Sequence, residues 1–466
     1  MGVRHMQETR ASVVIPADKC NLDWLMDSIQ SALEQEYSNY EVVIASCSHD
    51  KKIADIISRS DSRVEHVTIR ISADNAKLIT SLEAVTGEVI FFLLPGDRFH
   101  PNKIQEHMAF RNDHPEVILS YNAKFLVDSN NKIWYQTTIP PTRNYIDFIN
   151  NLPIRLSDIV VNKDEILRIK EFDDCNSPAG GDTIFVLRHV SNGSIVAGIN
   201  KPLNYQKQSI NYYSSRLDGD EYIGLIEAIN DFFYDQRCPQ EVRGMRNHVL
   251  CKIYLSGAYH AFLQKKTLDG QKLIREAISA DRSILDDQAS ILLEQLILIC
   301  LTCEDDIESY IDLVFSQIPS ELLWITQYRQ KVSANIYLLR GIADVLYGRA
   351  DQAALNFEKS ASHGLQLEGQ FMLKIITQVS DYGEAFGPHA AQKAIHIIGK
   401  NLKVIGKRNE ASWLMGTFFI NQAFINYQQD HYESVLPDVF NAISSRPKLV
   451  FNPGVLSISL RSARKL

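Results

Sequence analysis

SVVIPADKCNLDWLMDSIQSALEQEYSNYEVVIAS (12–46) contains a strand, a helix and a second strand in direct succession. Its ends, SVVIP (12–16) and EVVIAS (41–46), are short apolar runs of the kind that form buried strands. The segment between them repeats apolar residues at helical spacing, at positions 22, 25, 29 and 33. Two strands joined by a crossover helix predict parallel pairing in an α/β sheet.

The alternation continues along the chain. VEHVTIRI (64–71) has the period-two pattern of a strand, a helical run covers 74–85, and EVIFFLL (88–94) is the most apolar strand. These elements predict a mostly parallel, Rossmann-like sheet within residues 11–215. Ligands of such sheets bind beyond the carboxyl ends of the strands. The segments that directly follow the strands are Pro16–Lys19, Ala45–Asp50 and Leu94–His100.

Strand signals end near residue 215, and helical patterns fill 219–446. LRGIADVLYGRADQAALNFEKSAS (339–362) spaces small and aromatic residues as a tetratricopeptide repeat does. Weaker copies contain Ala258, Gly270 and Ala277, and Ala423, Tyr432, Ala442 and Pro447. The copies lie about 83 residues apart rather than ~34, so an irregular helical bundle stays open as the alternative. The repeat interpretation places Gly341, Ala353 and Ala442 at helix–helix contacts.

Four segments are therefore expected. They are an N-terminal extension (1–10), an α/β domain (11–215), an all-α helical-repeat domain (219–446) and a basic C-terminal tail (447–466).

Composition excludes several classes of protein. The 466 residues carry 48 Lys+Arg against 56 Asp+Glu, a net charge of −8 that argues against a general nucleic-acid binder. Seven scattered cysteines fit reduced thiols of the cytoplasm. MGVRHMQETRAS (1–12) lacks the apolar core of a signal peptide, and no apolar run reaches the ~18 residues of a membrane span. We expect a cytoplasmic protein.

The N-terminal half resembles the family 2 glycosyltransferases, which have the GT-A fold. The matching features are Pro16-Ala17 after the first strand, the Ser31 to Gln35 run on the first helix, and the Glu41 to Ile44 strand. Three further blocks follow in the family's order: ITSLEAVTGEVIFFLLPGDRFHP (79–101), LSDIVVNKDEILRIKEFDD (156–174) and GGDTIFVLRH (180–189). The resemblance covers roughly residues 11–215 and implies transfer of a sugar from a nucleotide donor, with inversion.

Two carboxylates carry the implied chemistry. Asp182 stands where the family has its general base, although an Asp at a helix start is also a common structural cap. Asp97 is the one acidic residue left at the positions of the family's acidic cluster, because Leu94 and Gly96 occupy the two other usual acidic positions. The resemblance implies that Asp97 binds a divalent cation, Mg²⁺ or Mn²⁺. Arg98 and His100 could add hydrogen-bond donors to the phosphates. The alternative is a Pro-Gly-Asp turn that closes a strand.

The implied nucleotide-sugar pocket contains residues that follow the first two strands, together with Arg98. Those residues are Pro16, Ala17, Asp18, Ser46, Ser48 and Asp50. The family's Val-Asp-Asp-Gly-Ser-x-Asp is here Ile-Ala-Ser-Cys-Ser-His-Asp (44–50), so the donor's base stays open.

Other motifs favour structural roles. DGDE (218–221) suits a linker or a helix start, and Cys300 and Cys303 lie in an apolar helical run without a second pair. His189, His363 and His396 have no partners at metal-binding spacing.

The last 21 residues contain five basic residues and no acidic ones. A final helix packed on the end of the helical domain is the favoured interpretation. Peripheral contact with an anionic membrane surface is the alternative.

The resemblance implies a cytoplasmic hexosyltransferase of polysaccharide biosynthesis. It would move a sugar from a nucleotide-sugar donor to a saccharide, a lipid-linked saccharide or a protein, and a protein partner would bind the helical domain. The alternative is a non-catalytic, glycosyltransferase-like scaffold protein.

Overall fold

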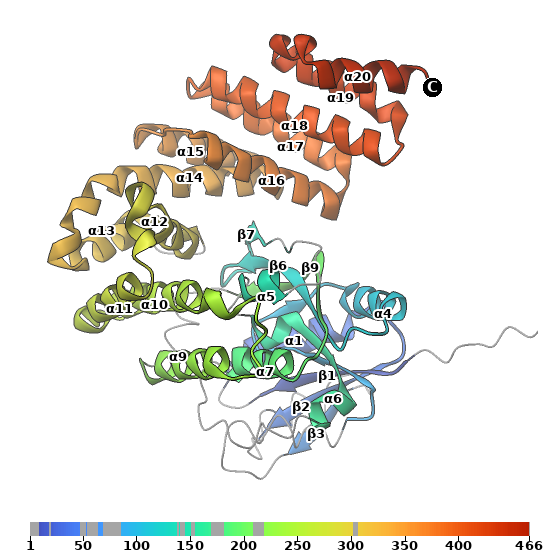
Figure 1. Cartoon of the computed structure of the whole chain (residues 1–466), viewed down its shortest axis with the longest axis vertical. Coiled ribbons are helices and arrows are strands. Elements are labelled where there is room, and N and C mark those ends of the chain that lie inside the picture. The colour runs from blue at the N-terminus through green and yellow to red at the C-terminus, as the bar shows by residue number, and fades with distance from the viewer. Residues whose placement is uncertain are drawn as a thin grey trace, which may run out of the picture. The chain divides into compact units, whose positions relative to one another are not determined.

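A computed structural model of the chain describes residues 9–17, 20–46, 53, 64–68, 85–137, 139, 145–150, 154–168, 181–207, 219–301 and 306–465. The chain divides into two compact units, Met1–Thr326 and Gln327–Leu466. The first unit holds a nine-stranded sheet with helices around it, and the second is made of helices (Figure 1). The predicted fold class, an α/β domain followed by an all-α region, is confirmed.

The described strands pair into one sheet in the order β3-β2-β1-β4-β8-β6-β9-β5, and β7 pairs with β6. Their bounds are β1 (Ala11–Pro16), β2 (Tyr40–Ser46), β3 (Val64–Thr68), β4 (Val89–Phe92), β5 (Arg98–Phe99), β6 (Leu119–Val127), β7 (Ile133–Gln136), β8 (Ile159–Asn162) and β9 (Val196–Lys207).

Two strands of the main sheet, β8 and β5, run antiparallel to the other strands of the order. β3, β2, β1 and β4 are parallel, as the sequence predicts. β8 then runs antiparallel between β4 and β6, and β9 is parallel to β6. β1, β2, β4, β6 and β9 therefore all point the same way, so their carboxyl ends share one edge.

Helices cover both faces of this sheet. The helices of the α/β part are α1 (Leu22–Leu33), α4 (Lys103–Asp113), α5 (Tyr145–Asn150), α6 (Lys163–Arg168) and α7 (Gly181–Ser191), with the short 3₁₀ helix η1 (Leu156–Asp158). α1 starts at Asn21, whose side chain accepts hydrogen bonds from the backbone N–H groups of Asp23 and Trp24. Its apolar stripe, which includes Leu25 and Ile29, packs with α4 on one face of the strands.

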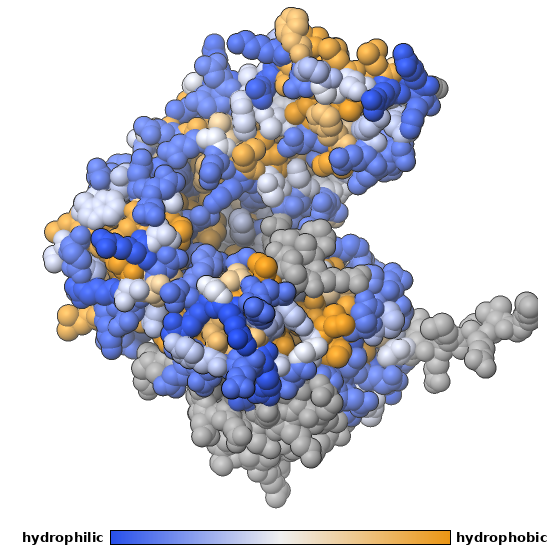
Figure 2. Space-filling view, in the orientation of Figure 1, coloured by the Kyte–Doolittle hydropathy of each residue, from blue (hydrophilic) through white to orange (hydrophobic). Residues whose placement is uncertain are grey.

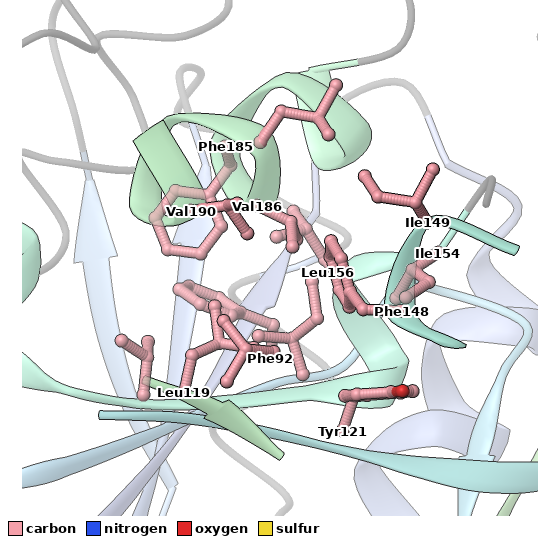
Figure 3. Close-up of a cluster of buried hydrophobic side chains, with 14 of the residues drawn as sticks. Phe92, Leu119, Tyr121, Phe148, Ile149, Ile154, Leu156, Phe185, Val186 and Val190 are labelled. Atoms are coloured by element: carbon pink, nitrogen blue, oxygen red, sulfur yellow. The ribbon is translucent and has the colours of Figure 1, made fainter. Parts of the chain in front are cut away.

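The opposite face packs against α7. Figure 3 shows Phe185, Val186 and Val190 of α7 directed towards Phe92 and Leu119 of the sheet. The rings of Phe92 and Phe185 meet edge to face, with their centroids 5.9 Å apart. This contact fixes α7 against the strand that leads into Asp97.

A buried carboxylate joins the opposite, amino-terminal edge of the sheet. Glu41 accepts hydrogen bonds from Ser12 Oγ (2.5 Å) and from the backbone N–H (2.6 Å) and Oγ1 (2.7 Å) of Thr86, and it pairs with Arg10 (3.0 Å). Burial by itself would raise the pKa of Glu41, but these hydrogen bonds and Arg10 hold it below its usual value. Glu41 thereby ties β2 to β1 and to the turn before β4.

The change from strands to helices falls where the sequence predicts it, between the end of β9 at Lys207 and the start of α9 at Gly219. Packing groups the chain differently. Phe232 and Phe233 of α9 (Gly219–Tyr234) and Val249 of α10 (Arg246–Leu263) enter the same core as the strands. The first compact unit therefore extends to Thr326.

The remaining described helices of the first unit are η3 (Arg243–Met245), α11 (Thr267–Ala280), η4 (Arg282–Leu285), α12 (Asp286–Leu301) and α13 (Ile307–Gln317), and η5 (Ser320–Tyr328) spans its end. The second unit contains α14 (Arg329–Leu346), α15 (Ala350–Ser362), α16 (Gly369–Phe386), α17 (Pro388–Val404), α18 (Arg408–Gln428), α19 (Tyr432–Ser445), η6 (Pro447–Phe451) and α20 (Pro453–Ala463). Gly219, Asp220 and Glu221 of the DGDE motif open α9, and Cys300 is buried in α12, in line with their predicted structural roles. Asp218 and Cys303 lie outside the described residues.

Three hairpins account for the predicted repeat copies. α10/α11, α14/α15 and α18/α19 are each joined by a three-residue turn whose middle residue, Lys265, Gly348 or Asp430, has a positive φ. These turns lie about 83 residues apart, the spacing seen in the sequence. Another hairpin, α16/α17, lies between the last two, so successive pairs in the second unit start roughly 40 residues apart. The helices are longer than those of a ~34-residue repeat, which explains the unusual period.

Small residues lie at the helix contacts as predicted. Ala353 and Ala442 are fully buried. A Cβ added to Gly341 would lie 2.9 Å from the ring of Phe357 in the facing helix. The glycine is therefore required by close approach of α14 and α15. The tail forms η6 and α20, and α20 packs on α19, which confirms the favoured structural interpretation.

Gly341→Ala tests this packing. The new methyl group would push against the buried ring of Phe357, so the free energy of unfolding should fall by about 1–2 kcal/mol despite the better helix propensity of Ala. Urea denaturation, monitored by far-UV circular dichroism, measures this change in the free energy of unfolding. Gly369→Ala, where a Cβ would meet open space, is the matched control and should be neutral or slightly stabilising. Equal effects of both changes would contradict the close approach.

Candidate functional site

The carboxyl edge of the sheet collects the predicted donor residues that the structure describes. Pro16 lies beside Ala45 in the register of β1 and β2, and the N–H of Ala17 donates to the carbonyl of Ala45 (2.8 Å). Ser46 is the last residue of β2, and the turn that contains Asp97 follows β4. These three strands are adjacent and parallel, so their ends lie side by side.

Several predicted site residues fall outside the described part of the structure. Asp18, Ser48 and Asp50 belong to this group, as do the side chains of Ser46 and Asp182. Their assigned roles stay predictions.

Asp97 is fully buried, and its carboxylate has three protein partners. Ser157 Oγ donates to Oδ2 (2.6 Å), the backbone N–H of Lys207 donates to Oδ1 (3.2 Å), and Arg155 Nη1 lies 3.3 Å from Oδ1. Burial raises the pKa of Asp97, and the charge of Arg155 and the Ser157 hydrogen bond oppose that rise. The carboxylate joins the turn after β4 to the start of η1 and the end of β9.

A polar stripe on one face of α1 holds the same turn. Ser28 Oγ accepts from the N–H of Gly96 (3.0 Å) and donates to the carbonyl of Asp97 (2.7 Å). Ser31 Oγ accepts from the N–H of Phe99 (3.1 Å), and Gln35 accepts from the N–H of Ile104 (3.1 Å). Ser28 and Ser31 lie three residues apart on one face of α1, and Gln35 follows the end of the helix, so the three side chains together contact the segment that carries Asp97.

A second buried charge cluster lies next to Asp97. Asp158 pairs with Lys124 and accepts a hydrogen bond from Asn204 (2.9 Å), and Lys103 Nζ donates to Asn122 (2.6 Å) and to the carbonyl of Ser157 (2.8 Å). Burial would raise the pKa of Asp158, but Lys124 and Asn204 hold it below its usual value. Burial lowers the pKa of Lys103 to about 7, against the opposing charges of Asp158 and Asp97. These side chains form a buried, hydrogen-bonded network next to the carboxyl edge of the sheet.

Arg98 lies on β5, which pairs with β9. Its guanidinium carbon is 5.0 Å from the ring centroid of Tyr205, and the ring of Phe125 stacks on Tyr205 at 5.1 Å. Arg98 Nε is buried and has no hydrogen-bond partner among the described residues. The predicted role of Arg98 in donor binding stays a prediction.

Asp182 occupies the second position of α7. Four residues join the end of α7 at Ser191 to the start of β9 at Val196, so the helix returns antiparallel to that strand. Its N-terminal turn is thereby directed towards the edge where β9 ends. This is the same edge that carries Pro16, Ser46 and the Asp97 turn.

The described residues do not fit a divalent cation at Asp97. Both of its oxygens already have donors, the neighbouring guanidinium repels a cation, and Leu94 and Gly96 offer no carboxylate. Among the residues that the structure describes, no group of three or more His, Cys, Asp or Glu side chains is placed to hold a metal.

Sequence reasoning missed several residues of this edge. Ser31 and Gln35 belong to the run that resembles the family, and the structure places Gln35 just after α1. Ser28 was missed, although its i, i+3 spacing to Ser31 puts the two hydroxyls on one face of an amphipathic helix. Arg155 and Lys207 had no such signal, since only the folded chain brings them to Asp97.

Comparison with known sequences finds relatives of part of the chain. No family model matches it. An uncharacterized glycosyltransferase of Rickettsia bellii is 23% identical over 134 residues, which cover 28% of this chain and 19% of that protein. One from Rickettsia conorii is also 23% identical over 134 residues, 28% of this chain and 22% of that protein. The chain thus spans about a fifth of the length of these relatives.

About 134 residues of this chain are thus similar to proteins that are named as glycosyltransferases. Similar solved structures are Staphylococcus aureus TarS 1–349 in complex with UDP-GlcNAc and the mannosyltransferase PcManGT of Pyrobaculum calidifontis with GDP-Man and Mn²⁺. Each is 13% identical with a TM-score of 0.41. TarS covers 71% of this chain and 90% of its own, and PcManGT covers 70% and 88%. Among the described residues, the structure contains no helix with the length and apolar character that a membrane span needs.

The Asp97–Arg155 pair generates the first prediction for this domain. Arg155→Met should lower the free energy of unfolding by about 3–5 kcal/mol, because it leaves a buried carboxylate without its cation. Adding Asp97→Asn should recover part of the loss, since the uncompensated charge is then removed. Urea denaturation of both single variants and the double variant gives the coupling energy.

Arg275→Met supplies the matched control. Arg275 pairs with Glu321 at an exposed site, so its loss should leave the free energy of unfolding nearly unchanged. Strictly additive effects of Arg155→Met and Asp97→Asn would contradict the proposed coupling.

Lys103 generates a prediction about pH. Its folded-state pKa of about 7 lies below the unfolded value of 10.5, so between these values the unfolded chain binds more protons. Stability from this group should therefore rise with pH, by up to about 1.4 kcal/mol per pH unit. Lys103→Met should remove that slope between pH 8 and pH 10, measured as the difference in unfolding free energy from the wild type. Parallel pH profiles of the two proteins would refute it.

Proposed function

We propose that the N-terminal domain is an inverting glycosyltransferase that moves a sugar from a nucleotide-sugar donor to an acceptor hydroxyl. The observation that carries the proposal is the common carboxyl edge of the sheet. The ends of β1, β2 and β4 lie side by side there, and the N-terminal turn of α7 is directed towards the same edge. The relatives named as glycosyltransferases give it independent support.

In this proposal the donor binds across the ends of β1 and β2. Pro16 and Ala17 line the floor, and Asp18, Ser46, Ser48 and Asp50 supply the polar groups for the nucleotide. Arg98 supplies a cation for the diphosphate, and its buried Nε without a described hydrogen-bond partner favours such a role.

Asp182 acts as the general base. Its carboxylate takes the proton of the acceptor hydroxyl, and the oxygen attacks the anomeric carbon as the bond to the diphosphate breaks on the opposite face. The nucleoside diphosphate leaves with the bonding electron pair, so the configuration at that carbon inverts.

Asp97 serves as a positioning residue in this scheme. Its contacts with Arg155, Ser157 and Lys207 fix the turn at the edge, and no step depends on a cation bound there. A divalent cation supplied with the donor would neutralise the diphosphate.

The finer assignments are part of the same proposal. They are a family 2-like, hexosyltransferase type of activity in the cytoplasm, and an acceptor that is a saccharide, a lipid-linked saccharide or a protein. A protein partner would bind the helical domain.

One observation favours the scaffold alternative. Leu94 and Gly96 replace acidic residues, and the carboxylate of Asp97 is occupied by protein donors. A domain that had lost catalysis could retain this arrangement for stability alone.

Asp182→Asn separates the two functions. With the donor that gives the largest thermal shift in a panel of nucleotide sugars, turnover should fall by ~10²–10⁴-fold, because the base is lost. Donor at about a hundred times its dissociation constant should still stabilise the variant by ~2.7 kcal/mol, as it does the wild type.

Asp269→Asn, the same change in the first turn of the exposed helix α11, is the control and should keep full turnover. Equal turnover of Asp182→Asn and the wild type would reject Asp182 as the base. A wild type that neither binds nor hydrolyses any donor would favour the scaffold.

A further inference from the structure

The C-terminal end of the second unit has an apolar outer face, formed by η6 and α20. Phe451 is 82% exposed, Leu460 63% and Leu456 46%. Figure 2 shows hydrophobic side chains gathered over this end of the helical region. Isolated exposed apolar residues are common, but a group of large ones on consecutive elements indicates a surface that is covered in use.

The two faces of α20 explain why these residues are exposed. Val455 and Ile458 are buried against Val435 and Val439 of α19, so they form the inner face. Leu456 and Leu460 are four residues apart and therefore share another face of the helix. That face is exposed to solvent, opposite the packing with α19.

Charge indicates what covers it. Residues 446–466 contain five basic residues and no acidic ones. Lys448, Arg461 and Arg464 are exposed. Arg464 lies one helical turn beyond Leu460 on the same face, and Lys448 precedes Phe451 by one turn of the 3₁₀ helix. Apolar and cationic groups therefore alternate over one surface.

We propose that this outer face of η6 and α20 docks on an anionic lipid surface. Such a surface offers acyl chains for Phe451, Leu456 and Leu460 and negatively charged headgroups for the flanking Lys and Arg side chains. A second copy of the chain fits less well, because a two-fold interface would bring the same cationic patches together. The inference does not depend on the proposed transferase activity.

Vesicle flotation of the full chain tests the proposal. The wild type should float with vesicles of about 30% phosphatidylglycerol in phosphatidylcholine and not with pure phosphatidylcholine, and added salt should weaken the binding. Phe451→Ser with Leu460→Ser should lower the partition coefficient about tenfold or more. Arg461→Glu with Arg464→Glu should abolish the preference for anionic vesicles.

The matched control is Leu268→Ser with Lys272→Glu. Leu268 is 81% exposed and lies one helical turn from exposed Lys272 on α11, far along the sequence from the tail. This control should bind vesicles as the wild type does. Thermal melting by circular dichroism checks that every variant is folded.

Three results would overturn the proposal. The first is a wild type that does not float with anionic vesicles, and the second is a control variant that loses binding as fully as the tail variants. The third is tail variants that convert a dimer to a monomer in sedimentation velocity while vesicle binding is unchanged, which would identify the face as a self-association surface.

Discussion

The buried carboxylate of Asp97 is the constraint on which the carboxyl edge of the N-terminal domain depends. A charge removed from water is tolerated only with close partners, and Asp97 takes them from segments far apart in the chain. Arg155 and Ser157 come from the start of η1, and the backbone N–H of Lys207 comes from the end of β9. The hydrogen bonds and the ion pair of one carboxylate therefore hold together three segments: the turn after β4, the start of η1 and the end of β9.

The polar stripe of α1 extends this constraint to the other side of the turn. Ser28 bonds to both an N–H and a carbonyl within the 94–97 turn, and Ser31 and Gln35 continue the contact along the chain. Buried backbone N–H and C=O groups that follow the end of a strand have no partner in the sheet and need hydrogen bonds from side chains such as these. The edge is thus rigid at its base, and Glu41 gives the opposite edge a similar anchor through Ser12 and Thr86. A rigid base is what the nucleotide-sugar site proposed for this edge would require of its scaffold.

The helical region obeys a different constraint, the close approach of paired helices. Gly341 against Phe357, Gly270 against Phe262 and Gly399 against Met415 repeat one device, in which a glycine admits a large side chain from the facing helix. Hairpins built in this way bury their inner faces and leave their outer faces free. At the last helix that freedom yields an apolar and cationic surface, which is a property of the tail rather than of the repeat.

By itself the sequence determined the local elements, their alternation and the parallel order of the first strands, because hydrophobic periodicity is written within each segment. It also located three helical hairpins from small residues such as Gly341 and Ala353, and it placed the candidate site at the ends of β1, β2 and β4. Tertiary structure alone decided that Asp97 pairs with Arg155, and that α9 and α10 complete the core of the first unit. Partners 58 residues apart leave no periodic signal, because their pairing arises from the three-dimensional path of the chain and the need to neutralise a buried charge.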